Sequence, residues 1–156
     1  MKNRFIIVSL FIFISVGLFS QQQNKVVVYQ DTDIEVSVFL NSIVKENEYI
    51  TFWSNWEYKT QKPRNELINN LINIIKKYDK DKNIDFIKWS SFKSIKEQVC
   101  IDVSDKTINI LQYIYYTNSG NFLYQYKHNE RSWDDIIPET PGEYIFNFVS
   151  KYSKTK

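Results

Sequence analysis

Residues 96–126 read KEQVCIDVSDKTINILQYIYYTNSGNFLYQY and carry the strongest β-sheet signal of the chain. β-Branched and aromatic residues dominate three segments, Lys96–Val103, Thr107–Tyr116 and Asn121–Tyr126, and such residues favour extended backbone. Turn-forming residues separate the segments, first at 105–106 and then at 118–120. Because both loops are short, we expect three consecutive strands that pair antiparallel as a meander.

The chain before this meander predicts further strands. Val26–Tyr29 is a short run of strand-forming residues. In the segment Ile34–Leu40, apolar side chains alternate with Glu35, Ser37 and Phe39, which is the period of a half-buried strand. The segment Tyr49–Lys59 has the same period, with one parity occupied by Ile50, Phe52, Trp56 and Tyr58. We expect these two alternating segments to form a hairpin.

Two amphipathic helices are predicted on either side of the meander. Pro63 opens a pattern in which apolar residues recur at helical spacing, at Leu67, Ile68, Leu71, Ile72, Ile75 and Tyr78. A second helix should begin after Thr140, with its hydroxyl at the N-cap, Pro141 at N1 and Glu143 at N3. The segment Ile84–Trp89 predicts a short strand or an irregular edge.

These elements together predict a single α+β domain. Its core would be an antiparallel sheet of about five to six strands packed against the middle helix and the C-terminal helix. The chain contains 3 Gly and 3 Pro but 17% aromatic residues, which is typical of a globular protein rather than a linker.

The N-terminal twenty residues have the composition of an export signal. Lys2 and Arg4 precede an apolar run from Phe5 to Phe19, and polar residues follow at once. The run is shorter than the roughly twenty residues of a membrane span. We therefore predict a signal peptide over residues 1–20 and one domain over residues 21–156, with an uncleaved anchor as the alternative. Either arrangement exports the domain, to the periplasm, the cell surface or the medium, and involves the membrane only through the leader.

The charge balance argues against a nucleic-acid-binding protein, and the cysteine content rules out a disulfide within the chain. Removing residues 1–20 takes away Lys2 and Arg4 and no acid, which leaves 18 basic residues against 18 acidic ones from totals of 20 and 18. A domain without net positive charge has no electrostatic footprint for nucleic acid. Cys100 is the single cysteine, so no disulfide can form within the chain, and we expect it to be a buried small apolar residue.

No combination of residues predicts catalysis, a cofactor or a metal site. Cys100 and the single histidine, His128, lie on different segments, so we expect a core thiol and a loop imidazole. Asp134 and Asp135 are adjacent and precede Pro138, which predicts a solvated turn. The run 79–82 spaces two acids as a calcium loop does, yet it lacks the glycine and the closing glutamate. The sequence therefore predicts a protein that is not an enzyme.

Aromatic residues are the one compositional excess, and they leave two interpretations open. They concentrate on the predicted strands, at Trp53, Trp56, Tyr113, Tyr115, Tyr116, Tyr124 and Tyr126. Strict alternation would place Leu111, Tyr113 and Tyr115 on one sheet face, and Ile108, Ile110, Ile114 and Tyr116 on the other. Either helices cover one face and a homodimer or small core covers the second, or an exposed aromatic surface binds a partner.

The C-terminal half resembles the surface-adhesin protein E-like domains. The resemblance rests on the strand that ends at Ile101-Asp102, the strand Ile108–Tyr116, the turn at 118–120, and the specific motif from Trp133 through Ile137-Pro138 to Thr140-Pro141-Gly142-Glu143. Upstream, Ile34–Trp53 is similar to the family's first hairpin, with Ser42 and Ile43 at the bend.

This resemblance implies an antiparallel sheet packed on helices and an adhesive role toward host proteins. Family members typically carry two cysteines at the positions of Val103 and Ser150, so this domain would lack their disulfide. Adhesion resides in surface residues rather than in the fold, and no binding residue can be matched. We therefore expect an exported protein that binds host-matrix or envelope proteins, with a periplasmic structural or assembly factor as the alternative.

Overall fold

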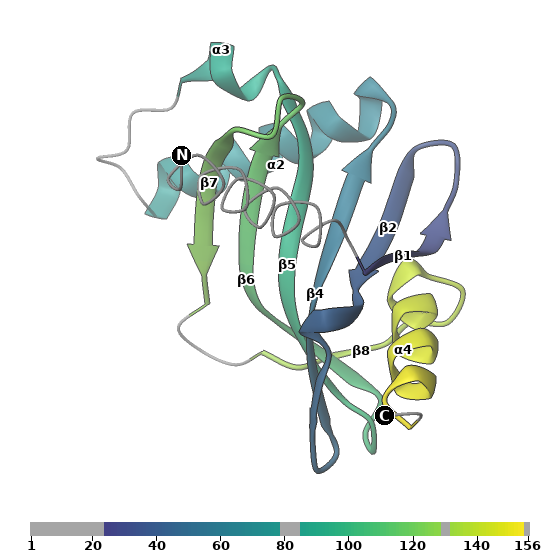
Figure 1. The fold of residues 1–156 in the computed structure, drawn as a ribbon. Coiled ribbons are helices and arrows are strands. Elements are labelled where there is room, and N and C mark those ends of the chain that lie inside the picture. Colours follow the sequence, from purple (N-terminus) through teal and green to yellow (C-terminus); the bar gives the residue numbers. More distant parts are fainter. Residues whose placement is uncertain (1–23, 79–84, 129–131, 155–156) are drawn as a thin grey trace, which may run out of the picture.

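The computed structural model describes residues 24–78, 85–128 and 132–154, and within them eight strands form one antiparallel sheet (Figure 1). The main path of the sheet runs β1-β2-β4-β5-β6-β7, while β3 pairs with β4 and β8 pairs with β6. The strands are β1 (Lys25–Gln30), β2 (Ile34–Phe39), β3 (Val44–Glu46), β4 (Tyr49–Tyr58), β5 (Phe92–Asp102), β6 (Thr107–Thr117), β7 (Phe122–Lys127) and β8 (Asp134–Asp135). The predicted leader at residues 1–20 and the charged run 79–82 lie outside the described residues.

The predicted meander and the upstream pairing are confirmed, but the strand count is wrong. β5, β6 and β7 are consecutive antiparallel neighbours, and β2 pairs antiparallel with β4. The sheet has eight strands rather than five to six, because β3 and β8 were not expected. Both are short and polar, with the sequences VKE and DD, and all their residues are exposed. Their extended conformation comes from pairing with a longer strand rather than from their own β propensity.

The helices are α2 (Gln61–Tyr78), α3 (Phe86–Trp89) and α4 (Pro141–Tyr152), and a 3₁₀ turn, η1, spans Leu40–Ser42. α3 corrects the expectation of a strand or an irregular edge at 84–89. The Asp85 carboxylate accepts a hydrogen bond from the Lys88 backbone N–H at 3.1 Å, which caps the helix at its first turn. No helix of the described residues is long and apolar enough to span a membrane.

α4 begins where the sequence predicts, although its N-cap differs in detail. The Thr140 hydroxyl makes no capping bond to the helix and instead donates to the Ile137 carbonyl at 2.7 Å. The Glu143 carboxylate accepts from the Glu139 backbone N–H at 2.8 Å, one residue further back than in a capping box. Glu143 thus still ties the first turn of α4 to the preceding chain.

One apolar cluster joins α4 to the strands β2, β4 and β5. Neighbouring strands place Phe52 opposite Val99 and Ile50 opposite Ile101. These side chains are buried together with Ile145 and Val149 of α4. The alternating positions Val36 and Val38 of β2 complete the cluster, in agreement with the predicted half-buried strands.

A second cluster joins α2 and α3 to the other half of the sheet. Its buried residues are Leu71 and Ile75 of α2, Trp89 of α3, Phe92 and Ile95 of β5, Tyr115 of β6 and Tyr124 of β7. Ile95 has the same parity as Val99 on β5, so the two clusters lie on one face of the sheet. In Figure 1, α2 crosses behind one end of the sheet, and α4 lies beside β1 at the other.

A β-bulge changes the alternation that we expected along β6. The register of β5 with β6 shifts between Gln98 and Val99, so that Leu111 is an extra residue. Ile108 pairs with Ile101 and packs against the buried cluster with α4. The expectation that Ile108 shares a face with Ile114 and Tyr116 is therefore wrong. Beyond the bulge, Ile114 and Tyr116 lie on the face opposite the helices.

We expect Phe52→Ala to lower the free energy of unfolding by about 3–5 kcal/mol, because it leaves a cavity in the middle of the cluster. Phe52 is fully buried, whereas Phe122 is 52% exposed. The matched control Phe122→Ala should therefore cost less than about 1 kcal/mol. Chemical denaturation followed by circular dichroism measures both changes, and equal losses for the two variants would contradict the assignment of the core.

Candidate binding site

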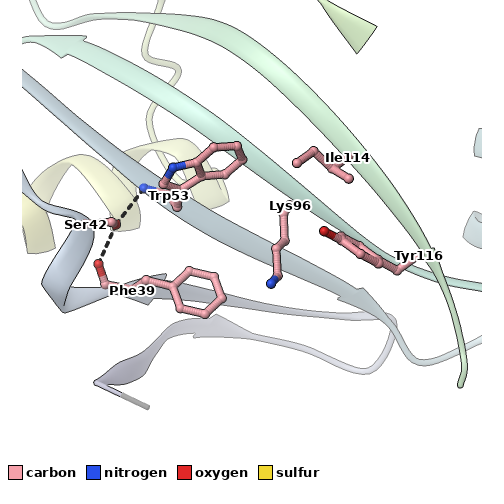
Figure 2. Close-up of a pocket in the computed structure, with 6 residues that line it drawn as sticks. All are labelled: Phe39, Ser42, Trp53, Lys96, Ile114 and Tyr116. Atoms are coloured by element: carbon pink, nitrogen blue, oxygen red, sulfur yellow. Dashed lines mark hydrogen bonds between the residues drawn. The ribbon is translucent and has the colours of Figure 1, made fainter. Parts of the chain in front are cut away.

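A groove of about 300 Å³ lies on the sheet face opposite to the one on which α2 and α4 pack (Figure 2). Six half-buried residues line it: Phe39, Ser42, Trp53, Lys96, Ile114 and Tyr116. They come from β2, η1, β4, β5 and β6, so the groove runs across four strands of the sheet. Because strands rather than loops carry most of these side chains, the groove has a rigid floor.

The Lys96 ammonium lies between two aromatic rings of this groove. Its Nζ is 5.2 Å from the centroid of the Phe39 ring and 5.3 Å from that of the Tyr116 ring. Both distances are within the range of a cation–π interaction. The rings therefore hold the ammonium at a defined position above the sheet, as Figure 2 shows.

Ser42 fixes one wall of the groove through two hydrogen bonds. Its hydroxyl donates to the Phe39 carbonyl at 2.6 Å and accepts from the Trp53 backbone N–H at 2.8 Å. The end of β2 and η1 are thereby tied to β4 (Figure 2). The hydroxyl of Ser42 is already occupied, so a ligand would find few free polar atoms in this wall.

Part of this site is predictable from the sequence. Trp53 and Tyr116 are among the aromatic residues singled out in the sequence, and both line the groove. Trp56, Tyr113, Tyr115 and Tyr124 instead belong to, or pack against, the cluster with α2. Phe39 and Lys96 were not singled out. Their positions in the sequence did indicate which face they occupy, because both alternate with apolar residues that face the helices.

A buried carboxyl group, Glu97, lies on the opposite face and was also missed. Glu97 is 8% exposed, and Ser54 donates to its carboxylate at 3.4 Å. Burial raises the pKa of Glu97 to about 7, and the side chains of Trp56 and Ser54 oppose this shift only in part. Burial also raises the pKa of Tyr58 to about 12, with a further contribution from the Glu97 charge. The sequence contained a sign of this burial, because Glu97 shares one face of β5 with the apolar residues Ile95 and Val99.

The residues considered for catalysis are not brought together. Cys100 is a buried free thiol on β5, opposite Asn109, and its parity places it on the groove side of the sheet. The His128 ring contacts Tyr113 and Tyr126 at 5.6 and 4.8 Å between centroids, and Tyr113 pairs with Glu97 on the helix side. The two residues are therefore separated by the sheet.

The structure of the acidic pair Asp134 and Asp135 differs from its prediction. Asp134 and Asp135 form the exposed strand β8 rather than a solvated turn, with Asp134 opposite Ile108. Among residues 24–78, 85–128 and 132–154, no three His, Cys, Asp or Glu side chains form a group that could hold a metal ion.

Comparison with known proteins agrees with the resemblance found in the sequence. The family model described as surface-adhesin protein E matches residues 20–149. The chain belongs to this family. It is similar in structure to protein E from non-typeable Haemophilus influenzae, with 10% identity over 85% of this chain and 88% of that one and a TM-score of 0.42. No curated protein matches the chain.

The two positions at which the family resemblance implies a missing cysteine have different surroundings in the structure. Val103, the first position at which the resemblance implies a missing cysteine, packs against the cluster that contains Ile145 and Val149 of α4. Ser150, the second such position, follows Val149, and its buried hydroxyl has no hydrogen-bond partner among the described residues. Val103 thus extends the apolar cluster that contains residues of both β5 and α4.

The raised pKa of Glu97 predicts that stability falls as the pH rises. A carboxyl group whose folded-state pKa lies above its ordinary value of 4.5 stabilises the fold fully at pH values below 4.5. This stabilisation is lost as the pH rises through the folded-state pKa of about 7. From the size of the shift, we expect a loss of about 3 kcal/mol between pH 4.5 and pH 8. Glu97→Gln should flatten this slope, while the exposed control Glu46→Gln should keep it. Urea denaturation at several pH values measures the slope, and an unchanged slope in Glu97→Gln would refute the assignment.

Proposed function

We propose that this chain is an exported, non-enzymatic module that binds proteins through the groove around Lys96. In this proposal residues 1–20 direct export and residues 21–156 form one domain presented at the cell envelope or released. Family membership supports an adhesin-like role. The observation that carries the proposal is the aromatic groove on the sheet face opposite to α2 and α4.

The chemistry of the groove suits a protein partner. Tryptophan and tyrosine are the residues that most often anchor protein interfaces, because each buries a large area with few rotatable bonds. Trp53 and Tyr116 are half-buried and already held by neighbouring strands, so binding would cost little side-chain entropy. The separation of Cys100 from His128 is consistent with a role that needs no catalytic pair.

The partners that we propose are host-matrix or envelope proteins. Two alternatives compete with this proposal. One is a homodimer through the same sheet face, which sedimentation analysis would detect. The other is a periplasmic structural or assembly factor, which differs in its location.

The location is tested by protease treatment of intact cells. We expect externally added protease to degrade the protein while a periplasmic marker stays intact, because an adhesin has to be exposed to host proteins. Detection with an antibody against the C-terminal region measures the outcome. Full protection of the protein in intact cells, with degradation after the outer barrier is opened, would favour the periplasmic factor.

Binding is tested with surfaces coated with extracellular-matrix proteins, plasma proteins or envelope extract. We expect Trp53→Ala/Tyr116→Ala to lower the captured amount by about tenfold or more, as the loss of two interface anchors does. The matched control is Phe86→Ala, which removes an aromatic residue that is 57% exposed outside the groove. Thermal unfolding of each variant establishes that it is folded, and equal capture by all three proteins would argue against the groove.

A further inference from the structure

We propose that the groove recognises a carboxylate flanked by apolar side chains, as in a surface segment of a partner protein that contains Asp or Glu beside Leu or Phe. This inference rests on the proposed function, because it names the chemistry of the partner at the same site. Lys96 would bind the carboxylate, and Phe39, Trp53, Ile114 and Tyr116 would contact the flanking side chains.

Lys96 has no acidic partner among the described residues. Within the described part of the chain, its ammonium forms neither an ion pair nor a hydrogen bond, and its contacts are with the two rings. Two lysines near the same strands differ in this respect. Lys59 lies 3.9 Å from a Glu35 carboxylate oxygen, and Lys93 lies 3.1 Å from one of Glu57.

The Lys96 ammonium keeps its capacity to donate hydrogen bonds. A lysine carries three N–H donors, and an aromatic ring attracts the charge without supplying a strong acceptor. The rings of Phe39 and Tyr116 thus position Lys96 and leave its donors for another group. A carboxylate is the acceptor that forms the strongest hydrogen bonds with such a donor.

The rest of the groove lining is mostly apolar. The backbone of β4 and β5 is paired on both sides within the sheet, so it offers no strand edge to a ligand. The Ser42 hydroxyl is occupied by Phe39 and Trp53. Among the six described residues that line the groove, Lys96 supplies the positive charge, and the aromatic and aliphatic side chains supply the apolar surface. An acidic side chain with apolar neighbours matches this composition.

The size of the groove limits how many side chains of a partner segment it can hold. At about 300 Å³ it lies at the lower end of the range for ligand pockets, so it holds a few side chains rather than a folded element. A tripeptide is therefore a sufficient probe. Acetyl-Leu-Glu-Phe-amide carries one carboxylate between two apolar side chains, and acetyl-Leu-Gln-Phe-amide has the same shape without the charge.

The test is a titration of the protein, produced from its full-length chain, with each of the two peptides. Nuclear magnetic resonance follows the indole N–H of Trp53, assigned by its loss in Trp53→Phe. We expect the Glu peptide to bind about fivefold tighter than the Gln peptide, as one partly exposed ion pair allows. The preference should disappear in Lys96→Met, which keeps the length of the side chain, and persist in Lys96→Arg.

Lys93→Met is the matched control, because it removes a lysine that already has a glutamate partner, and it should retain the preference for Glu. Equal binding of both peptides by the unmodified protein, or absence of binding, would overturn the inference. Capture of matrix or envelope proteins without a peptide preference would leave the proposed function standing and refute this inference alone. A Lys96-dependent peptide preference without such capture would support the inference and count against the proposed partners.

Discussion

The antiparallel pairing of β4 with β5 is the constraint on which the rest of the structure depends. It places Phe52 opposite Val99 on the face where α2 and α4 pack. Successive side chains of a strand point to opposite faces, so the same register sends Trp53 and Lys96 to the other face. A slip of one residue would exchange the two faces. The buried core and the open groove are therefore consequences of a single register.

The sequence predicted those parts of the fold whose signal is local and periodic. The alternation over Ile34–Leu40 and the turn at 118–120 were enough to locate paired strands. The elements that were missed take their conformation from contacts with distant residues. β8 is extended because Asp134 and Asp135 pair with β6, and α3 is helical because Asp85 caps a segment rich in strand formers. The bulge at Leu111 likewise depends on pairing with β5.

The groove was harder to predict than the fold because its residues come from strands far apart in the sequence. Tyr116 and Trp53 could be singled out as aromatic, yet nothing local indicates that Phe39 and Tyr116 enclose the same ammonium. That contact requires the order β2-β4-β5-β6, which brings four separate strands side by side. Glu97 is different, because its parity among the apolar residues of β5 was visible in the sequence. An acid within an alternating apolar pattern such as that of β5 is itself a sign of burial.

Lys96 and Glu97 show how a balanced composition can conceal unpaired charges. As neighbours in the sequence they look like a compensating pair, but strand geometry directs them to opposite faces of the sheet. Glu97 is buried on the face that the helices cover, where burial raises its pKa, and Lys96 forms no ion pair with an acid of the described residues on the groove side. The acid costs folding free energy when it is ionised, because its environment among the described residues is desolvated. The lysine carries no such cost because it is half exposed, and for the same reason its charge stays accessible to a partner.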